Sequence, residues 1–141
     1  FAKILIDELG EERGEELIIK SIMEYGKQIA ERVSEGKPDL PKWGVYSGSV
    51  SQDAEGRYIV RGCNLAKIFS EYDELELGRL YCYIDAAKSM AADVTQKLIH
   101  TTCEACGDDR CTFDIVPTTE EEREHFLNRK PAWKHVDPRL V

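Results

Sequence analysis

The densest group of residues that could do chemistry is the segment 103–111, which holds three of the five cysteines of the chain. Cys103, Cys106 and Cys111 lie around Gly107 and two aspartates. Short β-branched runs on both sides predict two strands. Because glycine tolerates a positive φ, we expect Gly107 at the centre of the turn between them, with Cys103 opposite Cys111. Two thiols in this arrangement could share a metal ion or form a disulfide.

Zinc is the metal that this set of residue types favours, because it prefers four nitrogen and sulfur ligands in a tetrahedron. His100 and Cys103 are three positions apart, and in a flat strand such positions face opposite sides. They can converge only if the strand curls or bulges. The alternatives are redox-active or merely packed thiols, and a histidine hydrogen-bonded in the core. The candidate metal ligands are Cys82, His100, Cys103, Cys106 and Cys111.

Two further cysteines lie near predicted helices. Cys82 and Asp85 are three residues apart in a helical pattern and should share one face. The alternative is a small buried Cys82 and a solvated Asp85. Cys63 precedes another predicted helix, whose N-terminus can lower the pKa of a thiol, although simple packing explains it equally well.

Hydrophobic periodicity and turn residues predict the elements that must position these side chains. A long N-terminal helix should reach residue 35, with a break at 11–14 and with Gly26 at a close packing contact. Its apolar stripe comprises Ile18, Ile22, Tyr25, Ile29 and Val33. The other expected elements are strands at 43–50 and 57–61, helices at 64–72 and 76–93, the hairpin at 98–116, a helix after Pro117 and an irregular tail at 131–141.

These elements predict an α+β fold in which an antiparallel sheet of two hairpins packs against the long N-terminal helix and the central helices. A pocket should lie between the sheet and the helices. The 141 residues, 42% of them hydrophobic, fit one domain spanning 1–141. The stripe on the N-terminal helix could form a homodimer interface, although packing on the chain's own sheet is the simpler expectation.

The net charge of −8 argues against nucleic acid as a partner, since phosphate binding relies on Lys and Arg. It also disfavours anionic membrane surfaces. No apolar run approaches the roughly 20 residues of a spanning helix. We therefore expect a cytoplasmic protein with reduced cysteines and a small-molecule ligand or substrate.

The sequence resembles the family named for L-2-amino-thiazoline-4-carboxylic acid hydrolase. The likeness over residues 15–116 rests on Cys63 with Ala66 and Phe69, on Glu76-Leu77-Gly78 before Tyr81-Cys82, on Asp85, and on Gly107-Asp108-x-x-Cys111-x-Phe113. Asn64 stands where a proline is expected. The resemblance implies hydrolysis of a small cyclic C–N compound such as L-2-amino-thiazoline-4-carboxylate. It implies a cysteine thiolate or a bound metal as the reacting group, with Cys63, Cys82 and Asp85 as catalytic residues.

The segment from position 100 to Phe113 is also similar to the four-vinyl-reductase domain. Members of that family bind small ligands and can hold zinc through an acidic residue and cysteines at this spacing. Here His100 stands at the position of the acidic ligand, and Cys82 would resemble the upstream cysteine. This resemblance implies a sensory or carrier domain without catalysis, so an enzyme and a binding module both stay open. A redox protein built on Cys103-x-x-Cys106 is a third alternative.

Overall fold

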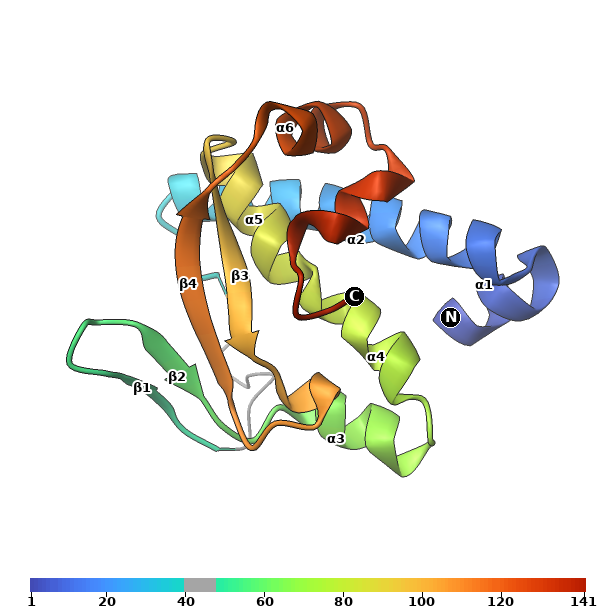
Figure 1. Cartoon of the computed structure of the whole chain (residues 1–141), viewed down its shortest axis with the longest axis horizontal. Helices are drawn as coiled ribbons and strands as arrows, with labels where there is room; N and C mark the ends of the chain where they lie inside the picture. Colours follow the sequence, from blue (N-terminus) through green and yellow to red (C-terminus); the bar gives the residue numbers. More distant parts are fainter. Residues whose placement is uncertain (40–47) are drawn as a thin grey trace.

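The computed structural model describes residues 1–39 and 48–141, and it contains helices on one side of a small antiparallel sheet (Figure 1). The helices are α1 (Ala2–Leu9), α2 (Glu11–Ser34), α3 (Asn64–Glu71), α4 (Leu75–Cys82), α5 (Ile84–Ala92) and α6 (Glu120–Leu127), with the short 3-10 helices η1 (Glu104–Cys106) and η2 (Pro131–Val136). The strands are β1 (Val50–Gln52), β2 (Tyr58–Val60), β3 (Gln96–Thr102) and β4 (Cys111–Pro117). The predicted α+β class is confirmed.

All strand pairs are antiparallel, in the order β1-β2-β4-β3. The two predicted hairpins therefore share one sheet, because β2 of the first pairs with β4 of the second. The predicted strand at 43–50 lies mostly outside the described residues, and β1 begins at its last position, Val50. The expected turn at 53–56 joins β1 to β2, and the Asp53 side chain accepts hydrogen bonds from the backbone of Glu55 and Arg57.

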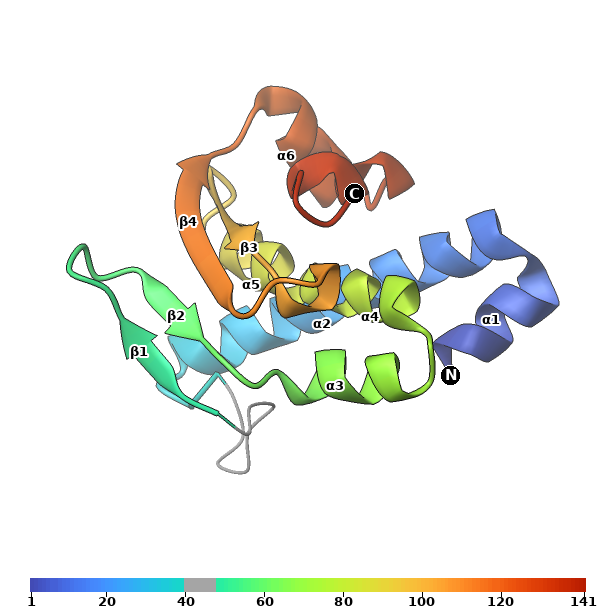
Figure 2. The same ribbon diagram turned by 60° about the horizontal axis from the view of Figure 1, so that its bottom comes forward.

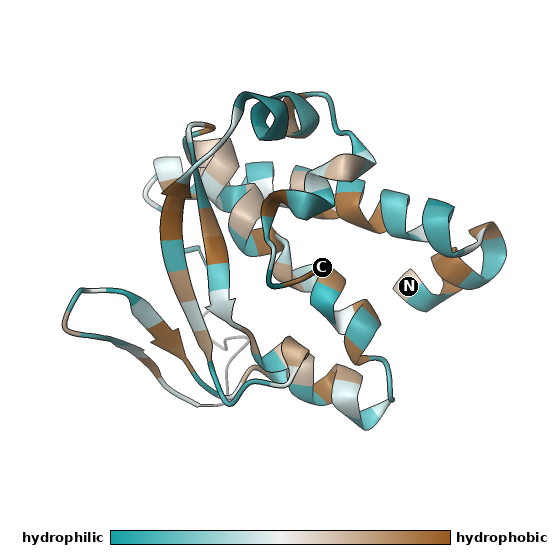
Figure 3. Cartoon of the chain, viewed as in Figure 1, coloured by the Kyte–Doolittle hydropathy of each residue, from teal (hydrophilic) through white to brown (hydrophobic). Residues whose placement is uncertain are grey.

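Helix α2 crosses behind the sheet and packs along α5, which in turn lies against β3 (Figures 1 and 2). Gly26 marks the closest approach, because a Cβ at this position would lie 2.5 Å from Cβ of Ala87. This confirms the expected close contact. Of the predicted apolar stripe, Tyr25 and Val33 are about half exposed, whereas the three isoleucines are buried. Apolar residues of α2, α5 and the inner sheet face meet in the core (Figure 3).

Three boundaries differ from the sequence-based expectation. The break in the N-terminal helix falls at Gly10, where φ is +81°, and not at 11–14. The helix predicted at 76–93 is two helices, because the chain turns at Tyr83, whose N–H bonds to the carbonyl of Leu80. The tail at 131–141 contains the 3-10 helix η2 and is not wholly irregular.

The C-terminal tail packs into the core because it carries apolar side chains at helical spacing. Trp133, Val136 and Leu140 are buried, and the indole of Trp133 packs on the ring of Tyr83. The residue at which the chain turns is therefore also a packing partner of the buried tail. Within residues 1–39 and 48–141, no helix combines the length and the apolar character needed to cross a membrane.

Candidate functional site

The site begins with a distortion in β3. His100 pairs with Phe113 of β4 and Thr102 pairs with Thr112, so the register shifts between His100 and Thr102. This irregularity is the bulge that the convergence of His100 and Cys103 requires, because it changes which face the later residues present. Both side chains are buried.

The end of α4 brings a second thiol to the same place. A ring nitrogen of His100 and the sulfurs of Cys82 and Cys103 all lie within 4.8 Å of one another. The Sγ atoms of Cys82 and Cys103 are 3.8 Å apart. Two thiolates bound to one tetrahedral zinc at about 2.3 Å each would be separated by about 3.8 Å. The three side chains therefore fit a zinc ion without a large rearrangement.

The imidazole of His100 is held by a carboxylate that the sequence did not indicate. Asp137 accepts a hydrogen bond from Nδ1 of His100 at 2.8 Å. Because a carboxylate only accepts hydrogen bonds, Nδ1 carries the proton. Nε2 is then the ring nitrogen that a metal would bind, after it has lost any proton of its own. A histidine that binds a metal commonly has this second hydrogen bond.

The remaining cysteines surround Cys103 in different ways, and all five cysteines are free thiols. Cys111 is buried, and its sulfur accepts a hydrogen bond from the backbone N–H of Glu104 at 3.3 Å. The thiol of Cys106 donates to the carbonyl of Arg139 instead. Cys63 directly precedes α3, and its backbone N–H donates to the Glu104 carboxylate. Of these three, Cys111 is the best candidate for a fourth metal ligand, because it is buried and its sulfur accepts a backbone N–H, whereas the thiol of Cys106 donates to a carbonyl.

The thiols near Cys103 shift one another's pKa values in opposite directions. Hydrogen bonds from Cys111 and Cys82, together with the charge of His100, lower the pKa of Cys103 despite burial. The pKa values of Cys82 and Cys111 are raised, first by their hydrogen bonds to Cys103 and then by burial. Burial lowers the pKa of His100, but the hydrogen bond to Asp137 and the charges of Asp85 and Cys103 raise it overall. A metal bound here would take the cysteines as thiolates, so its binding would release protons.

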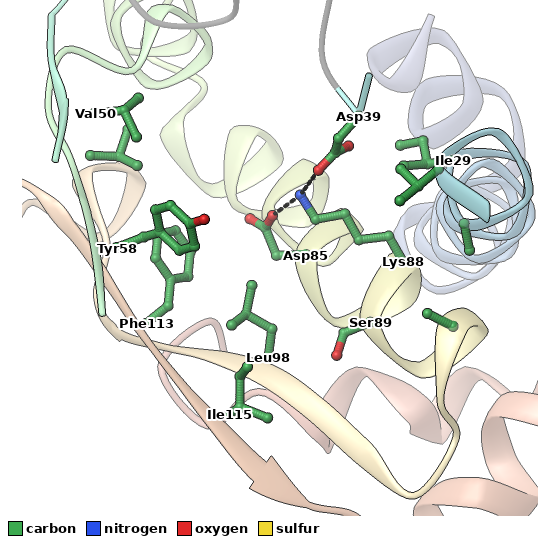
Figure 4. Close-up of a pocket in the computed structure, with 14 residues that line it drawn as sticks. Ile29, Asp39, Val50, Tyr58, Asp85, Lys88, Ser89, Leu98, Phe113 and Ile115 are labelled. Atoms are coloured by element: carbon green, nitrogen blue, oxygen red, sulfur yellow. Dashed lines mark hydrogen bonds and ion pairs between the residues drawn. The ribbon is translucent and has the colours of Figure 1, made fainter. Parts of the chain in front are cut away.

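A separate cavity of about 500 Å³ lies between the sheet and the helices α2 and α5 (Figure 4). Its volume is in the range of small-molecule sites. Most of its lining is apolar, with aliphatic side chains from the helices and the strands and the rings of Tyr58 and Phe113 from the sheet. No cysteine lines this cavity among the described residues.

Charged groups gather at one end of the cavity. Lys88 lies between two carboxylates, with its Nζ 2.9 Å from Asp39 and 3.0 Å from Asp85 (Figure 4). Burial lowers the pKa of Lys88, but Asp85 and Asp39 outweigh it and raise the pKa overall. Asp85 also lies 3.6 Å from Nε2 of His100. This carboxylate is therefore the link between the cavity and the thiol cluster.

The structure brings together four of the predicted metal ligands: Cys82, His100 and Cys103 form the close group, and Cys111 adjoins it. Cys106 lies beside this group, and its thiol donates to the carbonyl of Arg139. Of the three predicted catalytic residues, Asp85 lines the cavity, whereas Cys63 and Cys82 do not. The turn at Tyr83 separates Cys82 from Asp85, so that the two residues flank His100 from different helices.

Sequence reasoning missed Asp137 and Lys88. The spacing of Trp133, Val136 and Leu140 could have indicated that the tail is buried, which makes a carboxylate among them unusual. Lys88 follows Asp85 by three residues on one helix, a spacing typical of ion pairs. No local pattern places either residue beside His100 or the cavity.

The fold and site define an α+β protein with a ligand-sized apolar cavity and a candidate metal centre beside it. The phenol-responsive sensory domain of the transcription activator PoxR, in its crystal structure with phenol, has a similar fold. The two structures superpose with a TM-score of 0.53 at 16% sequence identity, and the match covers 91% of this chain and 77% of the PoxR chain. No curated protein sequence matches the chain significantly.

Residues 1–115 match the model of the L-2-amino-thiazoline-4-carboxylic acid hydrolase family. The match covers most of the chain, which therefore belongs to this family. The resemblance expected from the sequence is confirmed, and the sensory-domain fold is compatible with the likeness to four-vinyl-reductase domains.

Proposed function

We propose that this protein binds a small, mainly apolar ring compound in the cavity between the sheet and helices α2 and α5. The single observation that carries the proposal is the cavity itself, with its apolar walls and one charged end. A zinc ion held by Cys82, His100, Cys103 and Cys111 would join α4 to β3 and β4 beside it. With four protein ligands this would be a closed, structural zinc site.

The charged end indicates what the ligand should carry. Within the part of the chain that the structure describes, two carboxylates, Asp39 and Asp85, face one ammonium group, that of Lys88, so these groups together carry an excess of negative charge. Among the described residues, Oδ1 of Asp39 is buried without a hydrogen-bond partner. Buried acceptors normally have donors. A ring bearing an amidinium, amine or hydroxyl group would supply one, while its apolar body contacts Tyr58 and Phe113.

Calorimetric titration with benzamidine, phenol and benzoate tests this ligand class. We expect benzamidine and phenol to bind more tightly than benzoate, because benzoate would meet Asp39 and Asp85. The variant Asp39→Asn should weaken benzamidine binding by about tenfold, the loss of roughly one charge-assisted hydrogen bond. Asp114→Asn is the matched control, because Asp114 lies between two lining residues of β4 but does not line the cavity. Equal effects of both variants, or preferential binding of benzoate, would contradict the proposal.

Hydrolysis of a cyclic C–N compound is the second candidate, and membership of the hydrolase family favours it. Asp85 is placed to accept a proton from a water molecule in the cavity as that water attacks the ring carbon. The ring nitrogen would take up the proton as the C–N bond breaks. Asp85→Asn should then abolish the loss of L-2-amino-thiazoline-4-carboxylate, followed by chromatography, and Cys82→Ala should do the same if its thiol takes part. If the wild-type protein consumes no substrate, hydrolysis is refuted and only the binding function remains.

A further inference from the structure

The C-terminal segment, residues 131–141, contributes to the candidate metal centre although the family match ends at residue 115. Its contribution is Asp137, which is 1% exposed. Oδ2 of Asp137 accepts two hydrogen bonds from His100, one from the backbone N–H at 2.9 Å and one from Nδ1 at 2.8 Å. Oδ1 accepts a third from the backbone N–H of Arg139. Both carboxylate oxygens therefore have donors, which hold the group in one orientation.

Other contacts fasten the segment around the metal ligands. Arg139 pairs with Asp108 at 2.7 Å, and the same Asp108 oxygen accepts the backbone N–H of Cys103 at 2.7 Å. Lys97 of β3 donates to the carbonyl of Val136 at 2.8 Å. The segment thus touches β3 before His100 and the connection that follows Cys103.

We propose that Asp137 is a positioning residue that makes Nε2 of His100 a metal ligand, and that docking of the C-terminal segment and metal binding stabilise each other. The inference rests on the zinc site of the proposed function. Without Asp137, the imidazole could rotate or carry its proton on Nε2, and in either case Nε2 would not offer its lone pair to the metal. If the docked segment raises the affinity for zinc by some factor, thermodynamic linkage requires that bound zinc raise the equilibrium constant for docking by the same factor.

Zinc affinity measured by competition with a chromophoric chelator tests the role of Asp137. Asp137→Asn should bind zinc about 10–100-fold more weakly than the wild type, the usual effect of losing such a partner. Trp133→Phe is the comparison, because it loosens the segment without touching His100, and by the linkage it should weaken zinc binding less than Asp137→Asn does. Circular dichroism of the metal-free proteins establishes that each variant is folded. Equal losses of affinity in both variants would reduce Asp137 to a structural role and overturn the proposal.

A double-mutant cycle distinguishes positioning from general destabilisation. If Asp137 acts through His100, His100→Ala should weaken zinc binding and the added Asp137→Asn should cost no more than twofold further. Losses that multiply would contradict the proposal. Cobalt substitution adds a spectroscopic readout: Asp137→Asn should shift the ligand-field bands but keep the thiolate charge-transfer bands. An unchanged cobalt spectrum would also count against the assignment.

Hydrogen exchange tests the coupling in the other direction. Zinc should slow amide exchange in residues 131–141 of the wild type, and it should do so much less in Asp137→Asn. If the wild type binds zinc but its amide exchange in this segment does not change, the coupling is refuted, whereas the metal site is not. A wild type that binds no zinc would instead refute the metal site of the proposed function.

Discussion

At the scale of single residues, the five cysteines differ by their surroundings and not by their type. Cys103 is buried, and hydrogen bonds from neighbouring thiols hold its pKa low. Cys106 is half-buried against the C-terminal segment, and burial first, then the charge of Cys103, raises its pKa to about 11. Cys63 is half-buried at the start of α3, where burial raises its pKa. Reactivity should follow these differences.

We expect N-ethylmaleimide to label Cys63 and Cys106 in the zinc-loaded protein and to spare Cys82, Cys103 and Cys111. A metal-bound thiolate is protected, whereas a half-buried free thiol reacts slowly but completely. Removing zinc with a chelator should make Cys82 label as well. Peptide mass spectrometry identifies the labelled positions. If Cys111 is labelled and Cys106 is protected, then Cys106 and not Cys111 is the fourth ligand.

At the scale of elements, the contact between α2 and α5 determines the wall of the cavity. The two helices approach closely at Gly26, where a Cβ would also lie 2.7 Å from the carbonyl carbon of Ala87. After α5 ends, Asp93 shapes the turn into β3 by accepting two hydrogen bonds from Thr95. These two features place Lys88 and His100 relative to each other.

The variant Gly26→Ala should destabilise the protein by about 1–3 kcal/mol, because the added methyl group forces α2 away from α5. Alanine by itself would favour the helix by about 1 kcal/mol, so the sign of the change reports the close contact. Ser21→Ala, at an exposed position on the same helix, is the control. Urea unfolding measures both variants. A stabilised Gly26→Ala protein would show that α2 and α5 do not approach this closely.

The Asp93 carboxylate should stabilise the fold in a pH-dependent way. Hydrogen bonds from the side chain and backbone of Thr95 lower the pKa of Asp93. A carboxylate with a lowered pKa stabilises the fold at pH values above its unfolded pKa of about 3.9, and the effect disappears as the pH falls through the folded pKa. The difference in unfolding free energy between wild type and Asp93→Asn should therefore be constant near neutral pH and shrink in acid. A difference independent of pH would contradict this assignment.

At the scale of the whole molecule, the candidate metal centre joins parts of the chain that are distant in sequence. Cys82 ends α4, His100 belongs to β3, and Cys111 begins β4. The cavity lies on the other side of Asp85, and the C-terminal segment covers His100. The candidate metal centre, the cavity and the C-terminal segment thus lie around one buried histidine.

Zinc should raise the melting temperature of the protein, because it binds the folded state far better than the unfolded chain. Cys111→Ser should release the metal and lower the melting temperature of the zinc-loaded protein by several degrees. With chelator present, the wild type and the variant should melt within a degree or two of each other. Differential scanning calorimetry with elemental analysis measures both. An unchanged melt and a metal-free wild type would refute the zinc site.

Local features of the chain could be predicted from the sequence. The helix at 64–72, the strands of the second hairpin and the positive φ of Gly107 follow from periodicity and turn chemistry, which act over a few residues. The set of candidate ligands also followed from residue types and spacing. Only the tertiary structure decided which of them converge.

Several decisive features depend on contacts between distant segments. The chain turns at Tyr83, whose ring contacts that of Trp133. Asp137, which follows α6 in the sequence, hydrogen-bonds to His100 of β3. The cavity forms because α2 packs on α5 while four strands supply the other wall. Packing energy between residues far apart in sequence overrides local preference at such places. The sequence by itself therefore determined the elements and the chemistry of the ligands, and the tertiary structure determined their partners.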